Sequence, residues 1–153
     1  MSLQASQQGR SNTAKLSRLA QVSQRAYLIV AWLFLIGVAV QVFLAGLSVF
    51  AGSNWWTAHR TSAHIIEYLP ILLIPLALLG RMPRSIVPLS GLLVLLFALQ
   101  YAFIEIAAAT GLSWLAAFHP VNALVIFAVT LAVAQRARCE GMGTAEPDAM
   151  TEA

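Results

Sequence analysis

Four long apolar stretches dominate the chain, and nearly all charged residues lie outside them. The stretches span residues 26–50, 57–79, 86–108 and 112–135. A bilayer core of about 30 Å needs roughly 20 helical residues, so each stretch is long enough to cross it. The connections are short, which makes helices that follow one another antiparallel neighbours. The pattern therefore predicts an all-α integral membrane protein, a four-transmembrane-helix up-down bundle over residues 26–138.

Three of the prolines modify this expectation. Pro70 and Pro75 fall inside the second stretch, where a missing N–H and a ring clash interrupt and bend a helix. Pro120 suits the first turn of a helix. The fourth helix therefore has two expected starts, one at the beginning of its apolar stretch and one near Phe118. The second start leaves residues 112–117 as a re-entrant segment.

Positive charge is distributed unevenly around the four stretches. Eight of the nine Lys and Arg residues lie before the first stretch, between the second and third, or after the fourth, and Arg60 lies near the opposite face. The positive-inside rule then places both termini in the cytoplasm, with the protein in a bacterial inner (plasma) membrane. Trp55, Trp56 and Trp114 fall in the outward-facing connections, as expected of an aromatic belt.

Both ends of the chain are polar. Residues 1–25 are expected to form a cytoplasmic tail and residues 139–153 a disordered cytoplasmic tail. The apolar content of residues 1–14 and 140–153 is too low for folding. Within the first tail, Leu16, Leu19 and Val22 recur at helical spacing between basic and polar residues. This pattern favours a short helix that lies on the inner leaflet of the membrane.

The composition narrows the function classes. Hydrophobic residues make up 59% of the 153-residue chain and charged residues 10%, which excludes a soluble domain of this size. The net charge of +3 is carried at helix ends, which indicates membrane anchoring and no nucleic-acid partner. Cys139 is the single cysteine, so a disulfide or a thiolate metal site is not available. No nucleophile–base pair or phosphate loop supports hydrolase or kinase chemistry.

Four polar side chains inside the stretches share one expected depth. They are Gln41, His64, Gln100 and His119. Each stands 16 or 17 residues from the arginine at the cytoplasmic end of its helix. At about 1.5 Å per residue, all four lie roughly 24–26 Å from these anchors, in the outer part of the membrane. Polar residues inside a membrane are costly, so the four are candidate functional residues.

The square arrangement of four helices suggests what these residues hold. The second and fourth helices occupy one diagonal, so His64 is expected to face His119 while Gln41 faces Gln100. A diagonal of about 14 Å leaves room for two imidazoles and a metal-centred ring between them. The natural occupant is haem b, with His64 and His119 as its metal ligands. Structural hydrogen bonding or proton handling by the histidines is the alternative.

Neighbouring polar residues are candidates to support such a site. Glu67 and Asn122 each follow a candidate ligand by three residues, where they can fix an imidazole orientation. The two glutamines are expected to form interhelical hydrogen bonds or to contact the cofactor. His59 is rotated by about 140° from His64 on an ideal helix. It is expected at the outer interface, either solvated or as an alternative ligand.

The residues from Ala116 to Ala123, which include the run His-Pro-Val-Asn-Ala, and the dipeptide His59-Arg60 resemble one four-helix half of the haem A synthase family. The membrane portion is similar to small bacterial four-helix proteins that carry this run. Histidines on the second and fourth helices of a half ligate haem in that family, which implies His119 and His59 as ligands. Trp56 stands where the family has a glutamate. The matched depths favour His64, and His59 is kept as the alternative.

These observations predict a small b-type haem-binding membrane protein that transfers electrons or serves as an accessory subunit of a membrane redox assembly. Its expected partners are the lipid bilayer and a redox subunit or a second copy of the chain. One alternative is a non-haem proton-coupled transporter with a polar path through Glu67, Glu105 and the histidines. Another is a structural membrane subunit whose polar residues lock the helices together.

Overall fold

The computed structural model describes the backbone of residues 2–142 and the side chains of residues 13–139, and this part of the chain contains helices and no strands. The elements in order are α1 (Ser2–Phe50), α2 (Trp55–Ile66), α3 (Tyr68–Leu79), α4 (Ile86–Thr110), the 3₁₀-helix η1 (Ser113–Ala117) and α5 (Phe118–Met142). Four spans are long and apolar enough to cross a membrane, which confirms the four predicted stretches. They are Thr13–Phe50, Trp55–Leu79, Ile86–Thr110 and Ser113–Cys139.

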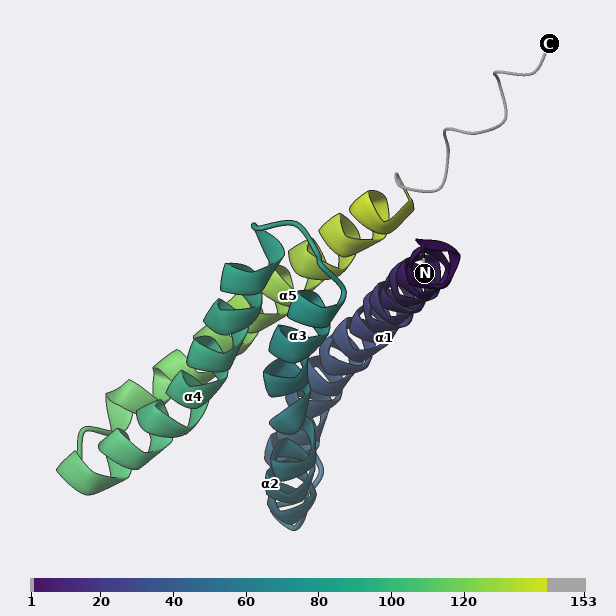
Figure 1. Cartoon of the computed structure of the whole chain (residues 1–153). Helices are drawn as coiled ribbons and strands as arrows, with labels where there is room; N and C mark the ends of the chain where they lie inside the picture. Colours follow the sequence, from purple (N-terminus) through teal and green to yellow (C-terminus); the bar gives the residue numbers. More distant parts are fainter. Residues whose placement is uncertain (1, 143–153) are drawn as a thin grey trace.

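The four spans form a bundle in which neighbours along the chain are neighbours in space. Helix α1 packs against α2, α3 and α5, and α4 packs against α3 and α5. Within the described residues, no pair of Cα atoms within 8 Å joins α1 to α4, or α2 or α3 to α5. These two pairs are therefore the diagonals, and the predicted four-helix bundle is confirmed. Figure 1 shows the α1–α2 and α4–α5 connections at one end, here called the loop end, and the α3–α4 connection at the other, the terminal end.

Helix α1 is longer than expected. It runs without a break from Ser2 to Phe50, whereas a separate short helix was expected before the first span. Residues 10–36 contain neither Pro nor Gly, so nothing in this segment interrupts the i to i−4 hydrogen bonds. The first tail is thus a continuation of the span, and its place on a membrane leaflet stays a prediction. Of the tail predicted to be disordered, residues 139–142 belong to α5, and residues 143–153 lie outside the described part.

The second span is interrupted, as its prolines predict. The break lies at Glu67, between α2 and α3. Pro70 has no N–H to donate to the Ile66 carbonyl, and its ring crowds that oxygen, so the helix cannot continue regularly through this turn. Pro75 is accommodated inside α3. The break places Glu67 at the midpoint of the span.

The fourth helix begins at Phe118, which confirms the later of the two expected starts. Gly111 ends α4 in the left-handed conformation with φ of 73°, a backbone state that favours glycine. The 3₁₀-helix η1 then leads into α5. Pro120 is the third residue of α5, where its missing N–H has no intrahelical acceptor to lose. Helix α5 also extends past the predicted end at residue 135, as far as Met142.

The apolar core occupies the half of the bundle nearer the terminal end. Its fully buried side chains come from α1, α3, α4 and α5, and include Tyr27, Phe34, Leu73, Leu93 and Val133. Helix α2 contributes no buried residue. The loop end is therefore held by a different set of contacts, which include interhelical hydrogen bonds and the aromatic contact of Phe103 with Phe118.

Candidate functional site

The imidazoles of His59 and His119 meet at the loop end of the bundle. Their ring centroids lie 6.2 Å apart, with 61° between the ring planes. His59 is in the second turn of α2, and His119 is in the first turn of α5. No Cα pair within 8 Å joins these two helices in the described part of the chain, so the side chains reach toward each other across the diagonal.

Each of the two imidazoles is held by a backbone carbonyl of the neighbouring helix. His59 Nδ1 lies 3.1 Å from the carbonyl oxygen of Gln41 on α1, and His119 Nδ1 lies 3.0 Å from that of Gln100 on α4. A carbonyl oxygen can only accept, so Nδ1 carries the proton and donates in both contacts. In a neutral imidazole the lone pair is then on Nε2. Both rings are therefore in the tautomer that a metal ligand needs when Nε2 binds the ion.

The side chains of the same two glutamines tie the helix pairs together. Gln41 Nε2 donates to Ser62 Oγ at 2.6 Å, joining α1 to α2. Asn122 Nδ2 donates to Gln100 Oε1 at 2.9 Å and to the Leu96 carbonyl at 2.7 Å, joining α5 to α4. The expected interhelical hydrogen bonds of the glutamines are present. Each glutamine bonds within its own helix pair and does not meet the other glutamine across the diagonal.

The two helix pairs, α1–α2 and α4–α5, repeat the same local arrangement. In each, a glutamine carbonyl holds a histidine, and the residue three positions after that histidine bonds the glutamine side chain. The sequence carries matching positions 59 or 60 residues apart. They are Arg25 and Arg84, Gln41 and Gln100, Gly52 and Gly111, Trp55 and Trp114, His59 and His119, and Ser62 and Asn122. Both glycines have positive φ, which supports the correspondence. This repeated spacing is a sequence signal that identifies His59 and Ser62 as the counterparts of His119 and Asn122.

His64, the first-choice ligand, lies elsewhere. Its ring stacks on Tyr101 of α4, with centroids 5.9 Å apart and 15° between the planes, and its side chain is 66% exposed. The structure pairs His119 with His59, the alternative ligand. The reason is angular, since five residues turn an ideal helix by about 140° beyond a full turn. When His59 faces the diagonal, His64 faces α4.

Glu67 and Asn122 have partners that differ in part from those expected. Glu67 Oε2 lies 3.5 Å from His64 Nδ1, so the predicted pairing within the helix is present. The same oxygen accepts a shorter hydrogen bond of 2.7 Å from the Tyr101 hydroxyl, a partner that the sequence did not single out. Asn122 supports His119 through Gln100 rather than directly.

Three further observations bear on what the histidine pair could bind. The indole of Trp56 contacts the His59 ring edge-on, with centroids 5.6 Å apart, so Trp56 covers one side of the pair. Within the described residues, no group of three or more His, Cys, Asp or Glu side chains lies close enough to hold a metal ion. Cys139 is exposed near the end of α5. The His59–His119 pair thus offers two nitrogen ligands.

Comparison with known protein families gives a match over part of the chain. Residues 41–110 match a family of unknown function, DUF6220. The matched region includes Gln41, His59, Glu67 and Gln100, and it ends before His119. No curated protein and no solved structure matches the chain. The resemblance to the haem A synthase family stays a prediction.

Proposed function

We propose that this chain is a small b-type haem-binding protein of the bacterial inner membrane, with the haem iron between His59 and His119. It serves as an electron carrier or as the haem subunit of a larger redox assembly. The observation that carries the proposal is the pair of facing helices whose histidines are each fixed through Nδ1 and so present Nε2 as the ligand atom.

The centroid distance of the two rings would allow both imidazoles to bind one ion. Two metal–nitrogen bonds of about 2 Å, together with the two ring radii, place imidazole centroids roughly 6 Å apart on opposite sides of an ion. The observed separation is 6.2 Å. A haem supplies the other four nitrogens itself, so a set of two protein ligands is sufficient. When bound, the haem provides one-electron iron chemistry whose potential depends on its ligands and surroundings.

The hydrogen bonds behind the rings support this assignment. Metal-binding histidines usually donate their other ring N–H to a carboxylate, carbonyl or water, which fixes the tautomer and makes the ligand more basic. His59 and His119 both donate to a main-chain carbonyl. Because the acceptors belong to α1 and α4, the packing of each helix pair sets the direction of its imidazole. The two helix pairs, α1–α2 and α4–α5, thus orient their imidazoles in equivalent ways.

The membrane arrangement follows from the charge pattern and the fold. The terminal end of the bundle carries eight of the nine basic residues, and the loop end carries Arg60 together with Trp55, Trp56 and Trp114. This distribution favours the cytoplasm for the terminal end. The histidine pair then lies toward the outer face, where a redox partner on that side reaches it over a short distance.

Optical spectroscopy on the purified protein tests the haem proposal. We expect a reduced-minus-oxidised spectrum with haem b bands from protein produced with adequate haem supply and kept in detergent. His59→Ala and His119→Ala should each abolish the bands, while His64→Ala should retain them. Helical circular dichroism checks that each variant is folded. A folded wild-type protein without haem bands would end the proposal, and loss of the bands in His64→Ala alone would return the ligand role to His64.

Rescue by a small ligand separates coordination from helix packing. In His59→Gly and His119→Gly, added imidazole fills the space left by the ring and can coordinate iron without joining two helices. Recovery of the haem spectrum on adding imidazole supports a ligand role. If the variants lose helix packing and imidazole restores nothing, the histidines are structural, and the chain is better described as a structural membrane subunit.

A further inference from the structure

A second polar cluster lies between the second and third spans, which are neighbours in the bundle. The Tyr101 hydroxyl of α4 donates to Glu67 Oε2 at 2.7 Å, and His64 Nδ1 lies 3.5 Å from the same carboxylate oxygen. Glu67 is at the midpoint of the 25-residue span Trp55–Leu79, and its side chain is 27% exposed. A carboxylate at this depth of a membrane is costly, which marks it as a candidate functional group.

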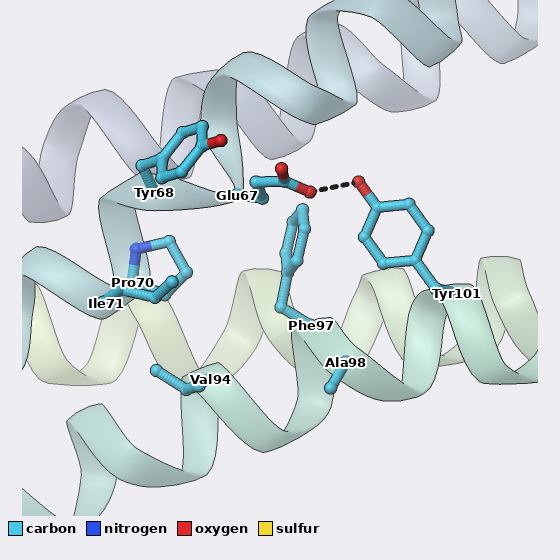
Figure 2. A pocket seen from close by; sticks show the side chains of 8 residues that line it. All are labelled: Glu67, Tyr68, Pro70, Ile71, Val94, Phe97, Ala98 and Tyr101. Atoms are coloured by element: carbon cyan, nitrogen blue, oxygen red, sulfur yellow. Dashed lines mark hydrogen bonds between the residues drawn. The ribbon is translucent and has the colours of Figure 1, made fainter.

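The cluster borders a cavity of about 200 Å³. Figure 2 shows Glu67, Pro70 and Ile71 on one side and Phe97, Ala98 and Tyr101 of α4 on the other. The cavity lies beside the break at Glu67, and the small side chain of Ala98 leaves space on α4. A dry cavity of about 150 Å³ holds benzene. By volume, the cavity is therefore large enough for one six-membered ring with small substituents.

One acceptor beside this cavity has no protein partner among the described residues. Glu67 Oε2 is engaged by Tyr101, whereas no described residue donates a hydrogen bond to Glu67 Oε1. Figure 2 shows this second oxygen directed away from Tyr101. Inside a bilayer there is no water to supply the missing donor. A hydroxyl group on a bound ring would supply it.

The repeat of the two helix pairs shows that the cluster is not required by the bundle. The positions that correspond to His64, Glu67 and Tyr101 are Leu124, Phe127 and Val42. The matching positions on the fourth and first spans thus carry apolar residues. Helix packing alone therefore does not explain why a carboxylate, a phenol and an imidazole occur at only one of these two equivalent positions in the bundle.

We propose that Glu67, Tyr101 and the cavity beside them bind the ring of a membrane-dissolved quinol, with one quinol hydroxyl donating to Glu67 Oε1. Exposed Tyr68 and Ile71 border the opening, so a ring arrives from the lipid phase and its apolar tail stays there. The choice of a redox-active ring rests on the proposed haem function. The cavity and its hydrogen-bonding groups do not depend on it.

Calorimetric titration of the full-length protein in detergent micelles tests the site, with decylubiquinol, decylubiquinone and decylbenzene as probes and empty micelles as the blank. We expect the quinol to bind about tenfold more tightly than the quinone or decylbenzene, because a quinone carbonyl cannot donate to a carboxylate. Glu67→Gln should reverse the preference toward the quinone, since an amide N–H donates to a carbonyl. Tyr101→Phe should weaken quinol binding about fivefold, because Glu67 loses the group that positions it.

Glu105→Gln is the matched control. Glu105 is an exposed carboxylate one turn along α4 from Tyr101 and does not line the cavity, so this variant should bind all three probes as the wild type does. Equal binding of quinol and decylbenzene, or an unchanged preference in Glu67→Gln, would overturn the proposal. The titration is repeated on haem-free His59→Ala protein. Binding at this site can then be interpreted even if the haem proposal fails.

Discussion

The hydroxyl of Tyr27 lies 2.9 Å from the hydroxyl of Ser90 and joins α1 to α4 across one diagonal of the bundle. Ser90 donates its own proton to the Ile86 carbonyl, so Tyr27 is the donor of this bond. The other diagonal is bridged at the opposite end by His59 and His119. Each diagonal thus has a polar side-chain link, a buried hydroxyl pair at the terminal end and an imidazole pair at the loop end.

Removing the Tyr27 hydroxyl should destabilise the bundle modestly. A hydrogen bond between membrane helices contributes about 0.6 kcal/mol on average and up to about 1.7 kcal/mol, and we expect Tyr27→Phe to fall in this range. The measurement is reversible unfolding in mixed micelles of increasing SDS content. Tyr68→Phe is the control because Tyr68 is 61% exposed and its hydroxyl bonds no described residue. Equal effects of the two variants would contradict the role of the Tyr27–Ser90 bond.

A methyl group at Gly37 should disturb the contact between the first two spans. A Cβ added there would lie 3.0 Å from Ile66 Cγ2, which is closer than carbon atoms normally approach. We expect Gly37→Ala to cost roughly 1–3 kcal/mol relative to Gly46→Ala, where nothing lies within 4 Å of the added atom. In the double variant Gly37→Ala, Ile66→Ala the two effects should be less than additive. Additive effects in SDS unfolding would show that the predicted clash does not occur.

Asn122 and Ser62, which form hydrogen bonds with the glutamine side chains, should differ in how much they stabilise the bundle. Asn122→Leu removes two interhelical hydrogen bonds and leaves Gln100 Oε1 without its donor, so we expect a loss of about 1–2 kcal/mol. Ser62→Ala removes one such bond and should cost about 0.6 kcal/mol. Both variants should retain haem bands, because neither residue touches the imidazoles in a hydrogen bond. Complete loss of haem in Ser62→Ala would contradict this division of roles.

The single cysteine allows a direct test of topology. Cys139 is exposed near the end of α5, at the terminal end of the bundle. A thiol reagent that cannot cross membranes should label it in inside-out vesicles and not in intact spheroplasts. Cys139→Ala combined with Ser53→Cys moves the thiol to an exposed position in the α1–α2 connection and should reverse the pattern. Labelling of Cys139 in intact spheroplasts would place the C-terminus outside.

Hydropathy was sufficient to predict the four spans, because length and apolar content decide whether a helix can cross a bilayer. The break in the second span followed from Pro70, and the start of α5 from Pro120. The pairing of histidines was harder to predict. Counting residues from the basic anchors gives a depth, but it does not say which face of a helix points to the diagonal. His64 has the matching depth and the wrong face, whereas the repeated spacing of Gln41–His59 and Gln100–His119 carries the missing angular information.

The carbonyls that hold the two imidazoles are main-chain atoms, which limits what mutagenesis can detect. Replacing Gln41 or Gln100 by alanine leaves the carbonyl in place, so an alanine scan would score both positions as nearly dispensable for ring orientation. Only a change to the backbone itself reveals their contribution. An ester in place of the amide between Gln41 and Val42 weakens the acceptor beneath His59 without altering any side chain. Protein semisynthesis is therefore the suitable way to probe how this bundle sets the tautomer of its histidines.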